Sequence, residues 1–189
     1  MARTESRAVP LGSPAPAFSL LDVTSGAQVA SADLGAGQPL LVMFICNHCP
    51  FVKHIRAELA AIGRDYQDKL GIAAISSNDV TTHPGDHPDR MREEAAAQGY
   101  SFPYLYDETQ EVAIAYGAAC TPDFFLFDRD RALAYHGQLD GSRPGNDVPV
   151  TGADLRAAID ALLAGEAPAS AQTPSVGCNI KWRAGNQPG

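Results

Sequence analysis

The stretch in which a long apolar run meets two cysteines constrains the fold more than any other part of the sequence. Leu40–Ile45 is a continuous apolar run, and Cys46 and Cys49 follow it. A run of this length without a polar face predicts a strand that is buried on both sides. After the cysteines, Pro50 suits the first turn of a helix, where its missing N–H group removes no hydrogen bond. The cysteines are therefore expected at a corner between a strand and a helix.

Two cysteines at such a corner favour redox chemistry. The thiolate is the reactive form of cysteine, and the N-terminus of a helix stabilises a negative charge. We expect Cys46 to be the more exposed sulfur and to attack a disulfide, and Cys49 to resolve the mixed disulfide that forms. His48 is expected to tune the couple, because a protonated imidazole beside Cys49 would stabilise the thiolate. The Cys-x-x-Cys spacing indicates this function strongly only when it lies in a βαβ unit.

Composition and charge argue against several other classes of function. The chain has 189 residues, of which 45% are hydrophobic and 19% are charged, as is typical of one globular domain. Its net charge of −8 argues against a nucleic acid or an anionic membrane as a partner. No apolar run reaches the roughly 20 residues of a membrane span, and residues 1–8 lack the apolar segment of a signal peptide. We therefore expect a cytoplasmic protein, in which cysteines serve catalysis or metal binding more often than structural disulfides.

The predicted elements follow the order strand–helix–strand, an insertion, and then strand–strand–helix. Residues 12–30 predict an N-terminal β-hairpin, and a strand at 71–76 completes a right-handed βαβ unit. Residues 78–101 predict an insertion, in which His83 and His87 are expected in a mobile surface loop. Three parts are expected along the chain, namely a flexible N-terminal tail, one domain, and a linker with a C-terminal tail that carries Cys178, at 1–11, 12–165 and 166–189.

This order, with Cys46-Asn-His-Cys49 at the start of the first helix, resembles the thioredoxin fold. Two further patterns support the resemblance, Thr121-Pro122 before a strand and Gly12-x-x-Ala-Pro-x-Phe-x-Leu20. The second is similar to the start of the redoxin branch, which includes alkyl hydroperoxide reductase and thiol-specific antioxidant proteins. Within that branch the chain looks like a peroxiredoxin-like bacterial subgroup. The resemblance implies an α/β protein with a central mixed sheet flanked by helices, extended by the hairpin, an inserted helix–strand segment and the C-terminal tail.

The resemblance also implies how a substrate would be held. In such folds the bond corresponding to Thr121–Pro122 is cis and lies against the two cysteines. The backbone of Thr121 would then be free to pair with an extended segment of the substrate. The implied substrates are disulfide-containing proteins or small thiols and disulfides, with a thioredoxin-type or glutathione system as electron donor. No cofactor and no metal are implied for the catalytic couple.

Two departures from related families leave an alternative open. Peroxiredoxins carry Pro-x-x-x-Thr-x-x-Cys; with Cys46 in the cysteine position, Pro39 matches but Met43 replaces the threonine. Thioredoxins carry a buried acid near the start of the strand, where this chain has Leu40. The favoured function is therefore a thiol–disulfide oxidoreductase. The alternative is a thiol peroxidase with antioxidant activity, in which Cys46 is oxidised to a sulfenic acid that condenses with Cys49.

Cys120 and Cys178 are candidates for additional redox thiols. Cys120 directly precedes Thr121, and Cys178 lies in a tail whose Trp182 can bury apolar area. We expect the tail to fold back over the domain and to bring Cys178 near Cys120 or Cys46. It would then form a disulfide with Cys120 or serve as a further resolving thiol, unless both cysteines stay reduced and inert. A zinc-binding module with all four cysteines as ligands is a less favoured function, because the chain lacks a second Cys-x-x-Cys pair.

Overall fold

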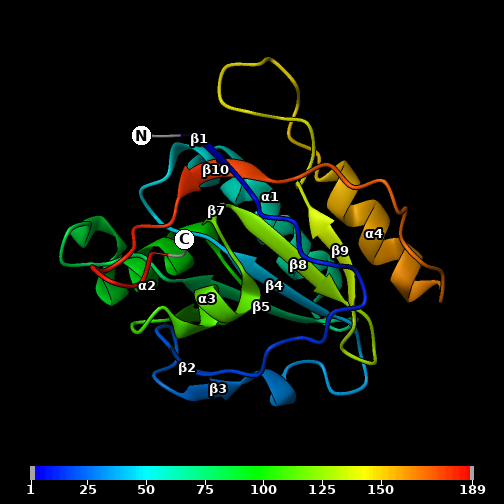
Figure 1. Ribbon diagram of the computed structural model, residues 1–189, viewed down its shortest axis with the longest axis horizontal. Coiled ribbons are helices and arrows are strands. Elements are labelled where there is room, and N and C mark those ends of the chain that lie inside the picture. Colours follow the sequence, from blue (N-terminus) through cyan, green and yellow to red (C-terminus); the bar gives the residue numbers. More distant parts are fainter. Residues whose placement is uncertain (1–2, 188–189) are drawn as a thin grey trace.

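A mixed sheet of seven strands forms the centre of the protein. The computed structural model describes residues 3–187, and the strand order in this sheet is β3-β2-β6-β5-β4-β8-β9. β4 (Leu40–Phe44) pairs in parallel with β5 (Gly71–Ser76) and antiparallel with β8 (Asp123–Phe127), as Figure 1 shows. Every residue of these three strands is buried. The continuous apolar run therefore forms a strand that is covered on both faces, as predicted.

The remaining elements complete this sheet, its helical cover and a second, smaller sheet. The other strands of the large sheet are β2 (Ser19–Asp22), β3 (Gln28–Ala30), β6 (Tyr104–Tyr106) and β9 (Leu133–Gly137). The helices are α1 (Pro50–Tyr66), α2 (Pro88–Gln98), α3 (Glu111–Tyr116) and α4 (Ala153–Leu163), with 3-10 turns η1 (Ser31–Asp33) and η2 (Pro84–Asp86). The smaller sheet holds β1 (Arg3–Glu5), β10 (Val176–Asn179) and β7 (Cys120–Thr121). Within residues 3–187, no helix combines the length and the apolar character needed to cross a membrane.

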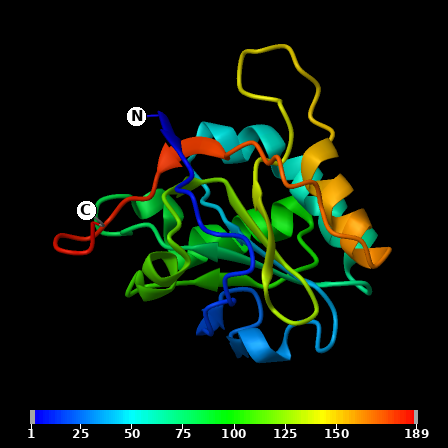
Figure 2. The ribbon, with the colours of Figure 1, turned by 45° about the vertical axis from the view of Figure 1, so that its right-hand side comes forward.

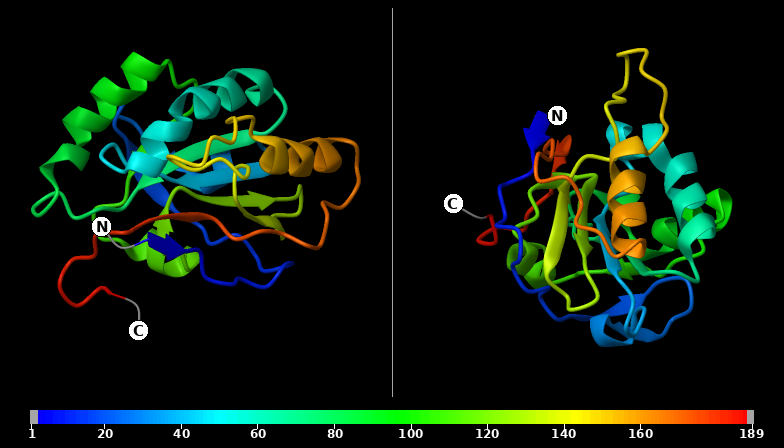
Figure 3. Two further views of the ribbon diagram at one scale, coloured as in Figure 1. Left: turned by 90° about the horizontal axis from the view of Figure 1, so that it is seen from above. Right: turned by 90° about the vertical axis from the view of Figure 1, so that its right-hand side faces the viewer.

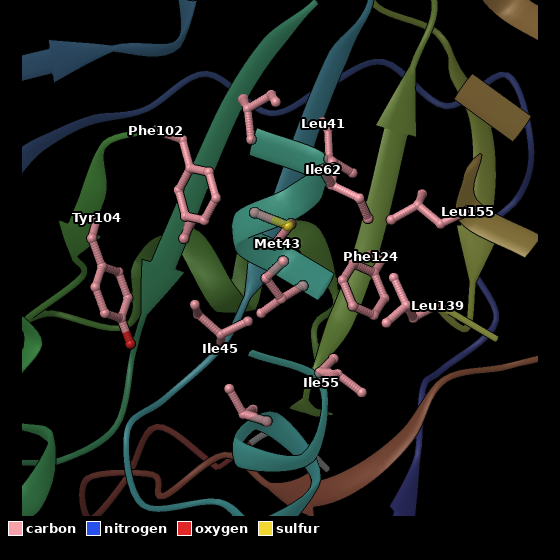
Figure 4. Close-up of a cluster of buried hydrophobic side chains, with 14 of the residues drawn as sticks. Leu41, Met43, Ile45, Ile55, Ile62, Phe102, Tyr104, Phe124, Leu139 and Leu155 are labelled. Carbon is pink, nitrogen blue, oxygen red and sulfur yellow. The ribbon is translucent and has the colours of Figure 1, made fainter. Parts of the chain in front are cut away.

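One face of the large sheet is covered by α1, α2 and α4. The left view of Figure 3 shows these helices on one side of the sheet, with the two terminal segments on the other. Leu59 and Ile62 on α1 are fully buried against Met43 on β4, and Figure 4 shows Ile62 and Met43 in this cluster. Burial of such a side chain contributes about 1.5–3 kcal/mol. The apolar side of α1, which includes Ile55, Leu59 and Ile62, is thus the surface that holds the helix against the sheet.

The opposite face is built from aromatic side chains, α3 and the terminal segments. Tyr116 on α3 packs edge-on against Phe44 and Phe125, with ring centroids 5.4 Å apart in both pairs. Ile180, directly after β10, is 1% exposed, and Trp182 packs against the same cluster. The C-terminal tail therefore docks on the domain, as predicted, because its apolar side chains complete this second core.

The two ends of the chain meet in the smaller sheet. β10 pairs antiparallel with β1 on one side and with β7 on the other. Figure 2 shows β1, in blue, beside β10, in red. The prediction of a flexible tail over 1–11 is therefore wrong for Arg3–Glu5, which form a strand. A three-residue segment has no strand signal of its own, and β10 supplies the backbone partners that order it.

Candidate active site

β4 and α1 bring the two cysteines to the corner that the sequence predicts. Cys49 is the N-cap residue of α1, and its carbonyl accepts a hydrogen bond from the N–H of Lys53 at 3.0 Å. Both sulfurs face Thr121. The Cys46 sulfur lies 3.2 Å from the Thr121 hydroxyl, and the Cys49 thiol donates to the Thr121 carbonyl over 3.2 Å. The Thr121–Pro122 bond is cis, as the resemblance implies.

The negative charge of the couple settles on Cys49 rather than on Cys46. Hydrogen bonds from the Cys46 thiol, from Cys178 and from the N–H of Val52 lower the pKa of Cys49 to about 5, although burial opposes this. The same hydrogen bond to Cys49, together with burial and the charge of Asp86, raises the pKa of Cys46 well above its usual value. When Cys49 is a thiolate it accepts these hydrogen bonds and no longer donates to Thr121. The two cysteines therefore titrate as a coupled pair, in which the hydrogen bond between them favours the thiolate at Cys49.

Burial of both sulfurs corrects the expectation that Cys46 is the exposed one. Cys46 is 1% exposed and Cys49 is 0% exposed. The N-terminal N–H groups of α1 also reach Cys49 and not Cys46, because the helix begins one residue after Cys49. If the helix began at Cys46, its first N–H groups would point at the Cys46 sulfur instead. The position of Pro50 at the start of the helix decides between the two.

Asp86 is the functional residue that sequence reasoning missed. Its side chain is fully buried beneath the loop between the two cysteines. One carboxylate oxygen accepts the backbone N–H groups of Asn47 and His48, at 2.8 and 3.2 Å. The other oxygen accepts a hydrogen bond from Asn78 Nδ2 over 2.8 Å and lies 2.5 Å from His48 Nδ1. Burial raises the pKa of Asp86, but the hydrogen bonds from His48 and Asn78 outweigh it and lower the pKa below the usual value.

The position of Asp86 also corrects the prediction that residues around it form a mobile surface loop. η2 carries Asp86 into the site, and the ring of His83 stacks on the ring of His48 with centroids 5.1 Å apart. His87 lies at the surface and caps α2 through its side chain, which accepts the N–H of Asp89. A signal for this arrangement exists in the sequence. β4 and β5 are parallel neighbours, so the loops after them meet at one edge of the sheet.

His48 has one ring nitrogen engaged and one without a partner. Nδ1 faces Asp86, whereas Nε2 is buried and has no hydrogen-bond partner within residues 3–187. Tyr104 holds the neighbouring Asn47, because its hydroxyl donates to Asn47 Oδ1 over 3.0 Å. His48 therefore lies where its charge can act on the couple, and its tuning role stays a prediction.

Metal binding by all four cysteines is not supported by their positions. Among the described residues, three ligand atoms come within 4.8 Å of one another only at Cys46, His48 and Asp86. These residue types can bind zinc. Here the carboxylate and the imidazole Nδ1 already bond to each other and to the surrounding loops. The four-thiolate zinc site considered from the sequence is not assembled.

The backbone of Thr121 is not free, which corrects the expectation drawn from the resemblance. β10 occupies the pairing edge of β7, with Cys178 opposite Thr121 and Asn179 opposite Cys120. The tail therefore lies where a substrate segment was expected. Beyond β10, the N–H of Lys181 donates to Asn78 Oδ1 over 2.8 Å, which fastens the tail to the same loop that carries Asp86.

The register of this ladder separates the two remaining cysteines. Side chains alternate across a strand, so Cys178 lies on the face of Thr121 and the active-site couple, whereas Cys120 lies on the other face. Cys178 joins the core cluster that contains Cys46 and Cys49. The Cys120 thiol contacts the Pro122 carbonyl at 3.6 Å, and burial raises its pKa far above the usual value. The tail thus brings Cys178 to Cys49, in the cluster that also contains Cys46. The prediction that Cys178 lies near Cys120 is wrong, because the register turns the two side chains to opposite faces.

A second buried acid lies directly after Pro122. Asp123 is fully buried and pairs with Nε2 of His136 on β9 at 3.0 Å. Burial raises the pKa of Asp123 despite the opposing effect of His136, and its Oδ2 atom has no partner. Asp123 lies opposite Phe44 in the β4–β8 ladder. Alternation along β8 places its side chain with Phe125, on the sheet face away from the couple.

Comparisons with known proteins identify the family of the chain. The sequence pattern described as "AhpC/TSA family" matches residues 11–136, which contain both cysteines of the couple and Thr121–Pro122. A thiol:disulfide interchange protein DsbE from Allochromatium vinosum is 32% identical over 127 residues, which are 65% of this chain and 63% of that protein. The chain thus matches less than two thirds of the length of this curated relative.

Solved structures extend the similarity to almost the whole chain. An uncharacterized conserved protein from Geobacillus kaustophilus is 52% identical, with a TM-score of 0.95 over 97% of this chain and 98% of that one. A hypothetical protein from Sinorhizobium meliloti 1021 is also 52% identical, with a TM-score of 0.94 over 96% and 100%. A thioredoxin-family thiol:disulfide interchange protein from Chlorobium tepidum TLS is 19% identical, with a TM-score of 0.62 over 82% and 99%. This last similarity concerns the fold alone, and it confirms the predicted thioredoxin fold.

Proposed function

We propose that this chain, which belongs to the AhpC/TSA family, is a thiol–disulfide oxidoreductase with Cys46 and Cys49 as its redox couple. One observation carries the proposal. Two adjacent thiols lie at a strand–helix corner and face Thr121, with the Cys46 sulfur 3.2 Å from its hydroxyl and the Cys49 sulfur 3.2 Å from its carbonyl. The similarity to a protein named for thiol:disulfide interchange supports the same activity.

The coupled titration of the two thiols defines an order of steps. Cys46 passes its proton to the Cys49 thiolate and attacks one sulfur of the substrate disulfide. A bond forms between Cys46 and that sulfur, and the other substrate sulfur leaves as a thiolate that takes up the proton from Cys49. The Cys49 thiolate then attacks the Cys46 sulfur. The substrate's remaining sulfur leaves as a thiolate, and the enzyme keeps a Cys46–Cys49 disulfide. The substrate gains two electrons and the couple loses two.

Substrate access requires a movement of the tail. Because β10 pairs with Thr121 and both sulfurs are buried, we propose that β10 leaves the β7 edge to admit a disulfide. Thr121 and Pro122 would then orient an extended disulfide-containing segment, or a small disulfide could enter the opened site. We propose that a thioredoxin-type or glutathione system in the cytoplasm returns the electrons.

Reduction of insulin by dithiothreitol, followed by turbidity, tests this function. The wild-type protein should accelerate the reaction, and Cys46→Ser and Cys49→Ser should return it to the rate of dithiothreitol alone. Cys120→Ala is the matched control, since its thiol faces away from the couple and this variant should keep the wild-type rate. Activity of Cys46→Ser equal to that of the wild type would show that the assignment is wrong.

Thiol peroxidase is the second candidate, and membership of the AhpC/TSA family is the observation that favours it. In this activity Cys46 would be oxidised by a peroxide and Cys49 would close the disulfide with loss of water. Met43 weighs against it, because a fully buried methionine stands where peroxiredoxins use a threonine hydroxyl. The charge distribution weighs against it too, since the pKa of Cys46 is raised and a thiol reacts slowly with peroxide.

A further inference from the structure

Cys49 has two cysteine neighbours in this structure. The thiol of Cys46 donates a hydrogen bond to the Cys49 sulfur, and so do the thiol and the backbone N–H of Cys178. Cys46 comes from the end of β4, whereas Cys178 comes from β10, more than a hundred residues later. Two thiols from distant parts of the chain therefore meet at one sulfur.

The close approach of the tail depends on the residue before Cys178. A Cβ atom added to Gly177 would lie 1.9 Å from the carbonyl oxygen of Thr121. Only glycine therefore allows β10 to lie against β7 in this register. Burial and the hydrogen bond to Cys49 raise the pKa of the Cys178 thiol to about 12, so Cys178 stays protonated and donates to the Cys49 thiolate.

We propose that Cys178 is a third redox cysteine, which exchanges with the Cys46–Cys49 disulfide to form a Cys49–Cys178 disulfide. The proposal rests on the proposed function in that turnover supplies the Cys46–Cys49 disulfide. The sulfur of Cys178 attacks the sulfur of Cys49, and the bond between Cys46 and Cys49 breaks. The electron pair of that bond goes to Cys46, which takes up the proton that Cys178 loses. One disulfide is exchanged for another, and no further oxidant is needed.

The exchange changes what the site can do. In the Cys46–Cys49 form, only non-covalent contacts hold β10 over Thr121. In the Cys49–Cys178 form, a covalent bond fixes β10 there and the substrate edge of β7 is closed. Oxidised protein would therefore exist as an open form and a locked form, with Cys49 common to both.

Partial oxidation followed by peptide mapping tests the proposal. Reduced full-length protein is treated with one equivalent of diamide, free thiols are blocked with N-ethylmaleimide, and the chain is digested with trypsin without reduction. Trypsin leaves Cys46 and Cys49 on the peptide 8–53, Cys178 on 157–181 and Cys120 on 93–129. A Cys49–Cys178 disulfide therefore links two peptides of distinct mass, whereas a Cys46–Cys49 disulfide lies within one.

The variants give sharp expectations. Wild-type protein should yield both disulfides, and Cys46→Ser should yield the link between 8–53 and 157–181 as its main product. Cys49→Ser should lose that link, and Cys120→Ala should keep the wild-type pattern. If Cys46→Ser leaves Cys49 and Cys178 free, or links either of them to the Cys120 peptide, the proposal is overturned.

Exchange is distinguished from direct oxidation by time. Wild-type protein trapped early should contain mainly the Cys46–Cys49 form, and the cross-linked form should grow after the diamide is removed. If the cross-linked form is absent at every time point, the proposal is overturned. In that case insulin reduction by the wild type would leave the proposed function standing. Conversely, the cross-link without any insulin reduction would support the exchange and count against the oxidoreductase function.

Discussion

Cys178 lies directly opposite Thr121 in the antiparallel ladder of β10 and β7. Thr121 is also the residue that both active-site sulfurs contact. One threonine therefore joins the couple to the C-terminal tail. Its hydroxyl lies by Cys46, its carbonyl oxygen lies by Cys49, and its strand pairs with β10. This relationship makes the tail part of the site.

The low pKa of Cys49 predicts a thiolate that persists in mildly acidic solution. Absorbance at 240 nm should show one thiolate that titrates near pH 5 in the wild type, which disappears in Cys49→Ser. In Cys46→Ser the midpoint of this titration should rise. The C–O bond is shorter than the C–S bond, so the serine hydroxyl lies farther from the Cys49 sulfur than the thiol that it replaces. A wild-type protein without thiolate absorbance at pH 7 would contradict this assignment.

The same shift predicts how stability depends on pH. The pKa of Cys49 is lower in the folded state than its usual value of 9.0, so its stabilising contribution is fully present above pH 9. It is lost as the pH falls through about 5. Urea titrations should therefore show the free energy of unfolding rising between pH 5 and pH 9, and this slope should be smaller in Cys49→Ser. An unchanged slope in the variant would count against the shift.

Replacement of Asp86 tests its effects on both stability and potential. Asp86→Asn loses an acceptor of buried hydrogen bonds, and we expect the free energy of unfolding to fall by about 1–3 kcal/mol. It also removes a negative charge that raises the pKa of Cys46, so the reduced form gains stability and the potential should rise. A shift of about 30 mV corresponds to about 1.4 kcal/mol. Asp68→Asn is the control, because Asp68 is exposed. Equal effects of the two variants on stability and potential would show that Asp86 has no role in the site.

His48 is predicted to favour the dithiol form. His48→Gln cannot carry a positive charge, so the potential of the couple against glutathione should be more negative than that of the wild type, measured at pH 6 and at pH 8. His87→Gln serves as the control, because His87 lies at the surface with Asp89 as its partner. Potentials that are the same in His48→Gln and the wild type at both pH values would exclude the tuning role.

A methyl group at Gly177 should lift the tail. In Gly177→Ala the new Cβ atom meets the Thr121 carbonyl oxygen, and β10 must move away from β7. We expect N-ethylmaleimide to label Cys46 and Cys49 at least tenfold faster than in the wild type, as followed by mass spectrometry. Gly141→Ala is the control, since its Cβ would have no atom within 4 Å. Labelling at the wild-type rate would mean that β10 does not guard the couple.

Peroxide should be a poor substrate. Stopped-flow measurement of tryptophan fluorescence, which Trp182 alone supplies in this sequence, should show oxidation by hydrogen peroxide no faster than that of an ordinary exposed thiol. The reason is that Cys46 keeps its proton and Met43 offers no hydroxyl to the peroxide. Oxidation several orders of magnitude faster would favour the peroxidase function over thiol–disulfide exchange.

The strand–helix corner could be predicted from the sequence because its causes are local. A continuous apolar run forms a buried strand wherever it is covered, and Pro50 starts the helix without losing a hydrogen bond. The βαβ unit and the later strand pair follow from the same local patterns. The cis Thr121–Pro122 bond came from the family resemblance, because nothing in the residues themselves distinguishes it.

Contacts between distant parts of the chain set which of the two sulfurs has the lower pKa and which segment lies over the couple. The carboxylate beside His48 comes from 38 residues along the chain, and the donors on Cys49 include a residue from the far C-terminus. Local patterns carry no information about such contacts, because they depend on strand register and on which loops share one edge of the sheet. Local sequence patterns are enough to place two cysteines at the start of a helix. Long-range packing of β10 and Asp86 buries the site, lowers the pKa of Cys49 below that of Cys46 and brings Cys178 to Cys49.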